Sequence, residues 1–268
     1  MPARIVVSGA LGRMGQTIAG LARDSSAFVL SCGIDRERPA PEDPIARQLG
    51  FAVYETPSSA AAAIQQADVV IDFSAPDGLQ ALLDHCGAAL AGKALVVGTT
   101  GLSNELQHQL RQASEHAAIM VSANYSIGVN LMLGVVASAA KVLTADRFDV
   151  EIVEAHHRHK ADAPSGTALL LGRVIAEARG VTLDAVRRDG RAGKTGERPT
   201  GEIGFHALRG GEVVGEHRVQ FLGGRERFEI THAASDRAIF AEGALIAAQW
   251  LAGKPAGMYS MQDVLDLE

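Results

Sequence analysis

The first 125 residues alternate short, nearly continuous apolar runs with Ala- and Leu-rich segments of helical periodicity. Apolar runs rich in β-branched residues that alternate with helices are typical of parallel strands covered on both faces. The sequence therefore predicts an α/β domain with a parallel sheet. The expected strands are 4–9, 28–35, 51–55, 68–74, 94–100 and 117–124, and the expected helices are 12–24, 58–66, 77–91 and 103–115.

A glycine-rich turn, VVSGALGRMG, joins the first expected strand to the first expected helix. Its spacing, G-x-x-G-x-x-G, gives a tight turn at Gly9, close backbone approach of a diphosphate at Gly12 and close helix–sheet packing at Gly15. Leu11 stands where the usual fingerprint has a glycine. Asp35 follows 20 residues after Gly15, where an acidic side chain accepts hydrogen bonds from an adenosine ribose.

This combination favours a dinucleotide-binding, Rossmann-type domain over a plain glycine-rich turn with a capping Asp. Asp35 favours NADH, whereas Arg36 and Arg38 follow it at once and suit the 2′-phosphate of NADPH. We therefore hypothesise that the protein uses both cofactors. A second glycine-rich segment, residues 190–196, resembles a P-loop, but Arg188 occupies the first glycine position and no strand is expected before it.

The pattern changes after residue 127, which predicts a second domain of α+β type. An apolar helix over 127–143 is expected to be buried between the domains, and residues 147–157 alternate like a half-exposed strand. Residues 202–234 contain three alternating segments with glycine pairs at the turns, which predicts an antiparallel meander and a mainly antiparallel sheet.

The last apolar helix, 237–251, is expected to pack on the first domain and to bury Ile239, Ile246 and Trp250. We therefore expect a dinucleotide-binding domain of residues 1–127 and 237–268. Residues 128–236 form an inserted domain for substrate binding and oligomerisation.

Composition narrows the function further. A net charge of −6 argues against nucleic-acid or anionic-membrane binding, which requires basic surfaces. The two cysteines, Cys32 and Cys86, have no disulfide or zinc spacing, and the N-terminus has no signal-peptide pattern. The 127–143 segment is interrupted by polar residues and is short for a membrane span. We expect a cytoplasmic enzyme.

Residues 154–172, EAHHRHKADAPSGTALLLG, contain the densest group of chemically active side chains. A metal site is one interpretation, but His157 and His159 share a strand face while His156 points away, and no further ligand completes a zinc set. A solvated basic run is another. A third interpretation, general acid catalysis, explains both the histidines and the lysine of this segment. Hydride addition to a conjugated carbon requires a proton donor, and His and Lys can serve as one.

The Ser-Gly-Thr that follows Pro164 begins an expected helix. Its amide and hydroxyl donors suit a carboxylate, and nearby cations strengthen such a pocket. Proton donors next to an anion-binding pocket predict a small, anionic, reducible substrate.

The segments SGALGRMG, DFS, VGTTG, EAHHRHKADAPSGTAL, IGFHALRGGEVVGEH and SDRAIFAEGAL together resemble the 4-hydroxy-tetrahydrodipicolinate (dihydrodipicolinate) reductase family over essentially the whole chain. The resemblance implies NADH- or NADPH-dependent reduction of a cyclic dicarboxylate in the diaminopimelate route to lysine, usually by a homotetramer. No residue is assigned to a metal.

The resemblance assigns site residues by motif. It implies His156 and Lys160 as the catalytic proton donors. Substrate binding falls to His157, Ser165, Gly166, Thr167 and Arg237. Cofactor binding falls to Gly9, Ala10, Leu11, Gly12, Arg13, Met14, Asp35, Arg36, Phe73, Gly98, Thr99, Thr100, Ser122, Ala123, Asn124 and Tyr125. Residues 122–125 depart from the family's usual Ala-Pro-Asn-Phe.

Three alternatives remain open at this point. The chain could be another Rossmann-type dehydrogenase, a non-catalytic dinucleotide sensor, or a metal-dependent hydrolase that uses residues 156–159. Cofactor oxidation with the cyclic substrate separates the first two from a reductase, and metal analysis addresses the third.

Overall fold

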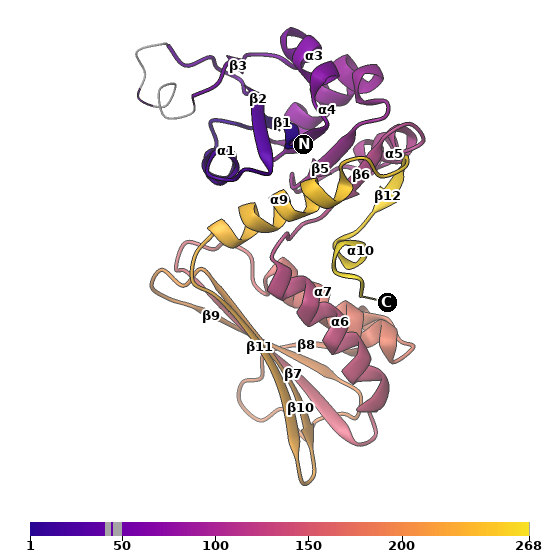
Figure 1. Cartoon of the computed structure of the whole chain (residues 1–268). Coiled ribbons are helices and arrows are strands. Elements are labelled where there is room, and N and C mark those ends of the chain that lie inside the picture. The colour runs from indigo at the N-terminus through magenta and orange to yellow at the C-terminus, as the bar shows by residue number, and fades with distance from the viewer. Residues whose placement is uncertain (41–43, 45–49, 268) are drawn as a thin grey trace. The chain divides into compact units, whose positions relative to one another are not determined.

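The computed structural model describes residues 1–40, 44 and 50–267. The chain divides into two compact units (Figure 1). The first comprises residues 1–127 and 238–266, and the second comprises residues 128–237 together with Leu267.

Within the described residues, the first unit contains a seven-stranded parallel sheet in the order β12-β6-β5-β4-β1-β2-β3 (Figure 1). Its strands are β1 (Ala3–Ser8), β2 (Phe28–Ile34), β3 (Val53–Tyr54), β4 (Val69–Asp72), β5 (Ala94–Val97), β6 (Ala118–Val121) and β12 (Gly257–Tyr259). All residues of the central strands β4 and β5 are buried, as expected for a parallel sheet covered on both faces. The predicted fold class is confirmed, and β12 adds an edge strand that the sequence analysis did not predict.

Helices cover both faces of this sheet. They are α1 (Arg13–Arg23), α3 (Pro57–Gln66), α4 (Pro76–Cys86), a short 3₁₀ helix (Gly87–Leu90), α5 (Asn104–Ala113), α9 (Ala238–Leu251) and α10 (Met261–Leu265). One face packs against α1, α9 and α10, and the other packs against α3, α4 and α5. Side chains from alternate positions of each strand therefore enter two separate apolar cores.

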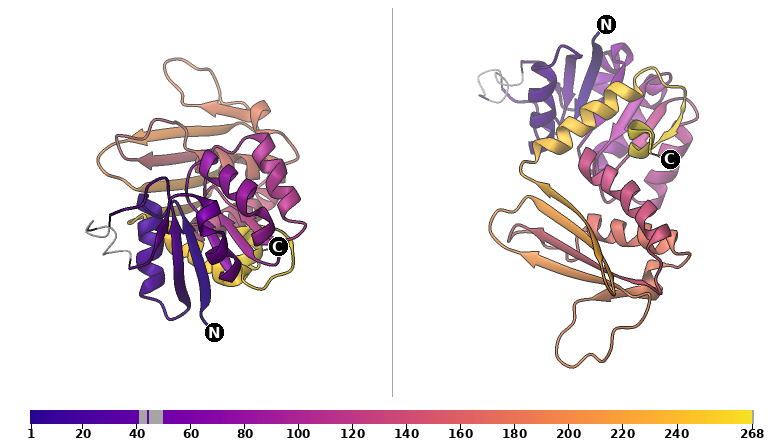
Figure 2. Two further views of the ribbon diagram at one scale, coloured as in Figure 1. Left: turned by 90° about the horizontal axis from the view of Figure 1, so that it is seen from above. Right: turned by 60° about the horizontal axis from the view of Figure 1, so that its bottom comes forward.

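Helix α9 packs on the first unit, as predicted, and crosses β4, β5 and β6 (Figure 2). The predicted buried face is wrong in one respect, because Ile246 is 45% exposed, and Ile239 and Trp250 are only partly buried. The small side chains of Ala241, Ala244 and Ala248 face the sheet instead. The helix is apolar on nearly every side, so its periodicity does not identify the face that small residues bring close to the strands.

The second unit packs helices on one face of a five-stranded mixed sheet, counted over the described residues. Its elements are α6 (Ile127–Val142), β7 (Phe148–His156), α7 (Gly166–Ala178), α8 (Leu183–Val186), β8 (Arg187–Asp189), β9 (Ile203–Arg209), β10 (Gly215–Gly223) and β11 (Arg227–Ala234), and the strand order is β11-β10-β7-β9-β8. β10 pairs antiparallel with β11 and β7, whereas β7–β9 and β8–β9 are parallel.

The predicted meander of 202–234 is therefore wrong. β10 and β11 form a hairpin, but β7 lies between β9 and β10. The alternating patterns identify strands correctly but carry no information on which neighbour each strand pairs with, because register and order depend on non-local contacts.

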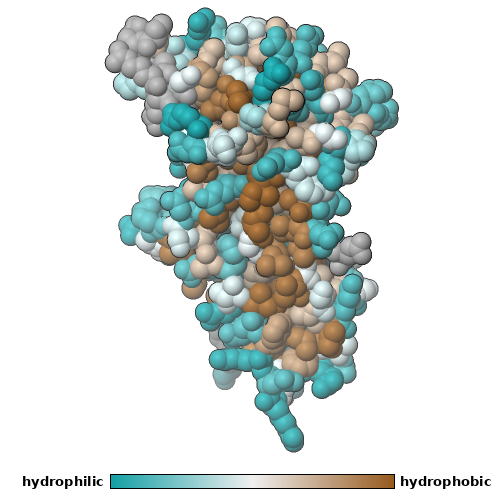
Figure 3. Space-filling model, in the orientation of Figure 1, coloured by the Kyte–Doolittle hydropathy of each residue, from teal (hydrophilic) through white to brown (hydrophobic). Residues whose placement is uncertain are grey.

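Helix α6 is buried on one side, where Met132, Val136 and Ala140 join the core of the second unit. Apolar side chains also gather on the outside over this helix (Figure 3). Leu131 is 47% exposed and Val142 is 75% exposed, which corrects the expectation of a buried helix. No helix in the described part of the chain is long and apolar enough to cross a membrane.

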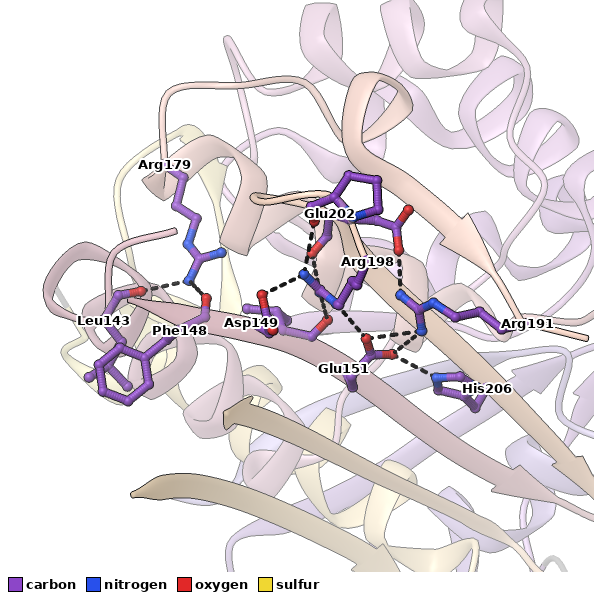
Figure 4. Close-up of polar contacts among 11 residues, drawn as sticks. Leu143, Phe148, Asp149, Glu151, Arg179, Arg191, Arg198, Glu202 and His206 are labelled. Carbon is purple, nitrogen blue, oxygen red and sulfur yellow. Dashed lines mark hydrogen bonds and ion pairs between the residues drawn. The ribbon is translucent and has the colours of Figure 1, made fainter. Parts of the chain in front are cut away.

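The loop between β8 and β9 is held against the sheet by ion pairs (Figure 4). Arg191 and Arg198 both contact the carboxylate of Glu151 on β7, at 3.1 Å and 3.0 Å, and His206 contacts the same carboxylate at 2.7 Å. Contrary to expectation, the short strand β8 precedes the glycine-rich segment 190–196. The loop ends in β9 instead of a helix, so the strand–loop–helix arrangement of a P-loop is not formed.

Candidate active site

The glycine-rich turn joins β1 to α1 as the sequence predicts. Gly9 has φ +78°, and a Cβ there would lie 2.5 Å from the Phe73 carbonyl oxygen. A Cβ at Gly15 would lie 2.1 Å from the Gly9 carbonyl oxygen, so side chains at either position would prevent this packing. Gly12 is the N-cap of α1 and makes no side-chain capping bond, so the first-turn amides of α1 face the turn.

Asp35 lies beside this turn, at the end of β2. Its Oδ2 accepts a hydrogen bond of 2.8 Å from the Leu11 N–H, so the carboxylate shapes the glycine turn. Asp35 and the turn line a cavity of about 640 Å³, which has room for part of a dinucleotide. Among its described lining residues are four carboxylates and one guanidinium, namely Asp35, Glu37, Glu55, Asp77 and Arg36.

The residues predicted for the nicotinamide side lie after β4, β5 and β6. The Phe73 ring packs against Gly98, where a Cβ would lie 2.3 Å from the ring, and its centroid lies 5.6 Å from that of Tyr125. A second cavity of about 430 Å³ is lined by Thr99, Thr100 and Ala123.

Some residues predicted to bind the cofactor are buried or bonded within the protein. Tyr125 is 1% exposed and its hydroxyl donates to the Val97 carbonyl at 2.8 Å. Ala10 is fully buried. The Ser122 hydroxyl donates to the Asn124 carbonyl at 2.8 Å, which shapes the turn after β6.

His156 is the last residue of β7, and its orientation is fixed by Glu154 two residues earlier on the same strand face. Glu154 Oε2 lies 2.6 Å from His156 Nδ1. Because a carboxylate only accepts hydrogen bonds, this contact places the imidazole proton on Nδ1 and leaves Nε2 as the atom that can exchange a proton with a ligand.

Glu154 is itself almost fully buried, with 1% exposure. Arg209 donates to its two oxygens at 2.7 Å and 2.8 Å, and the Ser165 N–H donates to Oε1 at 3.0 Å. Burial raises the pKa of Glu154, but hydrogen bonds from Arg209 and His156 outweigh burial and bring the pKa below its ordinary value. The carboxylate is therefore ionised at neutral pH.

The pKa of His156 is lowered chiefly by burial, with Glu154 opposing the shift and the positive charges of Lys160 and Arg209 adding to it. His217 packs edge-on against His156, with 5.2 Å between ring centroids. Burial lowers the pKa of His217 from 6.5 to about 4, so this ring is neutral at neutral pH. His217 Nε2 lies 3.0 Å from the Ser165 hydroxyl oxygen.

Lys160 follows β7 in a tight turn, in which its N–H donates to the His157 carbonyl at 3.1 Å. Its ammonium group lies 2.8 Å from a carboxylate oxygen of Asp162, which is 59% exposed. The Lys160 ammonium is therefore paired with an exposed carboxylate. A substrate anion can compete with Asp162 for this ammonium.

His157 and Arg237 form a second pair, although they are 80 residues apart. Arg237 Nη2 lies 2.9 Å from His157 Nε2. A guanidinium only donates, so Nε2 accepts and the proton of the neutral ring sits on Nδ1. That Nδ1 is buried and has no hydrogen-bond partner among the described residues.

Helix α7 begins beside these residues, with Ser165 as its N-cap. The Ser165 hydroxyl accepts from the Ala168 N–H at 3.2 Å and is buried, so it caps the start of the helix. Gly166 is exposed at the first helical position, and Thr167 follows it. These positions carry the partial positive charge of a helix N-terminus.

The sequence does not identify Glu154, Arg209 or His217 as parts of this group. Glu154 had a usable signal, because residues two apart on a strand share a face. Arg209 pairs in register with His156 through the parallel β7–β9 ladder, and no local pattern shows that pairing. The described residues contain no group of three or more His, Cys, Asp or Glu side chains placed to hold a metal ion.

Comparisons with known proteins agree across both units. Residues 3–125 match the family model described as dihydrodipicolinate reductase, N-terminus, and residues 128–265 match dihydrodipicolinate reductase, C-terminus. The 4-hydroxy-tetrahydrodipicolinate reductase of Caulobacter vibrioides is 44% identical over 98% of this chain and 97% of its own length. That of Ruegeria pomeroyi is 47% identical over 98% of each chain.

Solved structures show the same fold. Dipicolinate-bound dihydrodipicolinate reductase from Paenisporosarcina sp. TG-14 superposes with a TM-score of 0.73 at 23% identity, over 98% of this chain and 99% of that one. A probable dehydrogenase from Thermotoga maritima gives a TM-score of 0.60 at 13% identity, over 97% of this chain and 92% of that one.

Proposed function

Because the chain belongs to the dihydrodipicolinate reductase family and is an NAD(P)H-dependent oxidoreductase, we propose that it reduces 4-hydroxy-tetrahydrodipicolinate to tetrahydrodipicolinate on the diaminopimelate route to lysine. Both units match the same family, which favours this activity over another Rossmann-type dehydrogenase or a non-catalytic sensor.

The first unit fits a nicotinamide dinucleotide. The observation that supports this fit is the cradle at Gly9 and Gly15, where a Cβ would collide with backbone. Gly9 to Met14 would hold the diphosphate at the start of α1, and Asp35 and Arg36 would meet the adenosine ribose. The bound cofactor supplies the hydride.

Both NADH and NADPH are proposed cofactors, with NADH bound more tightly. Among the described lining residues of the 640 Å³ cavity, four carboxylates oppose one guanidinium. A 2′-phosphate brought into that cavity meets net negative charge, which disfavours NADPH, while Arg36 offers it one charge-assisted contact. A preference beyond roughly a thousandfold for either cofactor would contradict dual use.

The second unit supplies protons and binds the dicarboxylate. Loss of the 4-hydroxyl group as water leaves a conjugated ring, and hydride addition to that ring leaves a carbanion-like carbon. The charged ring of His156, through Nε2, or the Lys160 ammonium would protonate this carbon. Glu154 keeps the His156 proton on Nδ1 in the neutral ring and stabilises the charged ring. The lowered pKa of His156 makes the protonated ring a stronger acid than free histidine.

The substrate carboxylates would bind to the His157–Arg237 pair and to the start of α7 at Gly166 and Thr167. The exposed guanidinium of Arg237, which His157 Nε2 helps to hold in place, is a donor for a carboxylate. This pairing, formed by residues distant in sequence, is the observation that best supports a dicarboxylate substrate.

We also propose that the protein is a cytoplasmic homotetramer that forms through the sheet of the second unit. The α6 and α7 helices cover one face of that sheet, which leaves the other face for subunit contacts. Both cysteines are free and buried, which suits a reducing compartment. Analytical ultracentrifugation would measure the assembly.

The decisive experiment follows NADH and NADPH oxidation with freshly generated 4-hydroxy-tetrahydrodipicolinate. His156→Ala should lower turnover by roughly 10²–10⁴-fold if general acid catalysis is lost. Lys160→Ala should reduce both turnover and substrate affinity, and NADH affinity measured by calorimetry should stay unchanged in both variants. Wild-type kinetics in both variants would remove the catalytic assignment, and failure of the wild type to oxidise either cofactor would remove the function.

A further inference from the structure

Asp72 is a fully buried carboxylate at the end of the central strand β4, with 0% exposure. Thr99 Oγ1 donates to its Oδ2 at 2.5 Å, and Ser74 Oγ donates to its Oδ1 at 2.7 Å. The Ser8 hydroxyl and the Ser74 N–H are further donors to the same group. The pKa of Asp72 is raised above its ordinary value, because burial outweighs the opposing effect of these hydrogen bonds.

The three hydroxyl donors come from three separate segments at the carboxyl edge of the sheet. Ser8 ends β1 and pairs in register with Asp72, Ser74 lies two residues beyond Asp72, and Thr99 lies two residues after β5. A backbone hydrogen bond also joins the ends of β4 and β5, since the Gly98 N–H donates to the Asp72 carbonyl at 2.8 Å. One carboxylate thus joins the ends of β1, β4 and β5.

Each of these segments contains or adjoins residues that the family resemblance assigns to the cofactor. Ser8 directly precedes the Gly9 turn, Ser74 follows Phe73, and Thr99 lies between Gly98 and Thr100. The first segment belongs to the diphosphate side, and the segment at 98–100 belongs to the nicotinamide side. Asp72 therefore connects the two halves of the proposed cofactor site.

A purely structural role is a poor explanation for this group. Removing a carboxylate from water costs several kcal/mol, and apolar packing at the same position, as in Val70 and Ile71 of the same strand, stabilises a sheet without that cost. The hydrogen bonds from Thr99 and Ser74 are short and directional, so they fix loop positions more closely than packing does.

We propose that Asp72 is a positioning residue for the nicotinamide cofactor, which holds the 98–100 segment at a fixed place relative to the Gly9 turn. The inference rests on the proposed function. Asp72 acts through Thr99 and Ser8, and its side chain has no exposed surface for direct contact with a ligand.

The experiment compares NADH with ADP-ribose, which lacks the nicotinamide ring, by calorimetry on the full chain. Thr99→Val removes one donor to Asp72 with little change of shape. We expect its Kd for NADH to rise about tenfold, as for a lost net 1.4 kcal/mol, while its Kd for ADP-ribose changes less than twofold. Thr99→Ser, which keeps the hydroxyl, should bind NADH more tightly than Thr99→Val does.

Asp72→Asn should weaken NADH binding at least as much as Thr99→Val. The matched control is Asp68→Asn, which removes the same charge next to the amino end of β4, where Asp68 accepts from the Arg4 N–H. Asp68→Asn should leave both dissociation constants unchanged.

Two results would overturn the proposal. One is a wild-type Kd for NADH in folded Thr99→Val and Asp72→Asn, even with a lowered melting temperature, because that result shows a structural role alone. The other is equal weakening of NADH and ADP-ribose in Thr99→Val. If Asp72→Asn does not fold, the Thr99 pair decides the matter. Absence of NADH binding by the wild type would instead refute the proposed function.

Discussion

His217 should make the stability of the second unit depend on pH between its folded and unfolded pKa values. The ring is 4% exposed, and its pKa lies at about 4 instead of 6.5. Between these two values the unfolded chain binds a proton that the folded chain does not, so stability falls as pH falls through this range and is fully present above about pH 6.5. For these two pKa values, linkage gives a loss of about 2 kcal/mol between pH 8 and pH 5.

The test is His217→Gln, which keeps a polar side chain near Ser165 and removes the titrating ring. Urea unfolding would be followed by far-UV circular dichroism at pH 5 and pH 8, for wild type and variant. Other groups titrate equally in both proteins, so the pH dependence of the wild type should exceed that of the variant by about 2 kcal/mol. Equal pH dependence in the two proteins, or an NMR titration that places the His217 pKa near 6.5, would refute the reasoning.

Three further predictions concern the site. Glu154→Gln removes the carboxylate that fixes the ring of His156. It should lower kcat by about 10–100-fold with little change in the substrate KM. An unchanged kcat and pH profile would contradict an orienting role for Glu154. Arg237→Ala removes charge-assisted hydrogen bonds of about 1.5–3 kcal/mol and should raise the dicarboxylate KM by about 10–100-fold, whereas a change confined to kcat would argue against substrate binding. Glu55→Gln removes a negative charge at the edge of the cavity, whose repulsion of a 2′-phosphate is about 0.4–1 kcal/mol. The NADPH Kd divided by the NADH Kd, measured by calorimetry, should therefore fall by about 2–5-fold. A constant ratio would show that this carboxylate does not discriminate between the two cofactors.

Local patterns were sufficient for most of the first unit. The apolar runs of β1, β4 and β5 and the glycine turn at Gly9 are short-range features, so the sequence identifies them directly. β12 has only three residues and no distinctive periodicity, so its place beside β6 depends on long-range packing.

In the candidate site, too, local features were predicted and long-range contacts were not. Residues 156–160 and 165–167 are contiguous in sequence, and their chemistry was predicted from the residue types. The Arg209–Glu154 ion pair and the Arg237–His157 pair join residues 55 and 80 positions apart. Such pairs depend on strand order, and the sequence pattern predicted the wrong neighbour for β10.

The return of α9, β12 and α10 to the first unit has a consequence for biosynthesis. The core on one face of the parallel sheet includes Ala244, Leu251 and Met261, which the ribosome adds more than 100 residues after β6. The N-terminal segment must therefore remain incomplete during most of translation, while residues 128–237 form a continuous unit that can fold as soon as they emerge. The usual order of cotranslational folding, N-terminal domain first, is reversed for the completion of this chain.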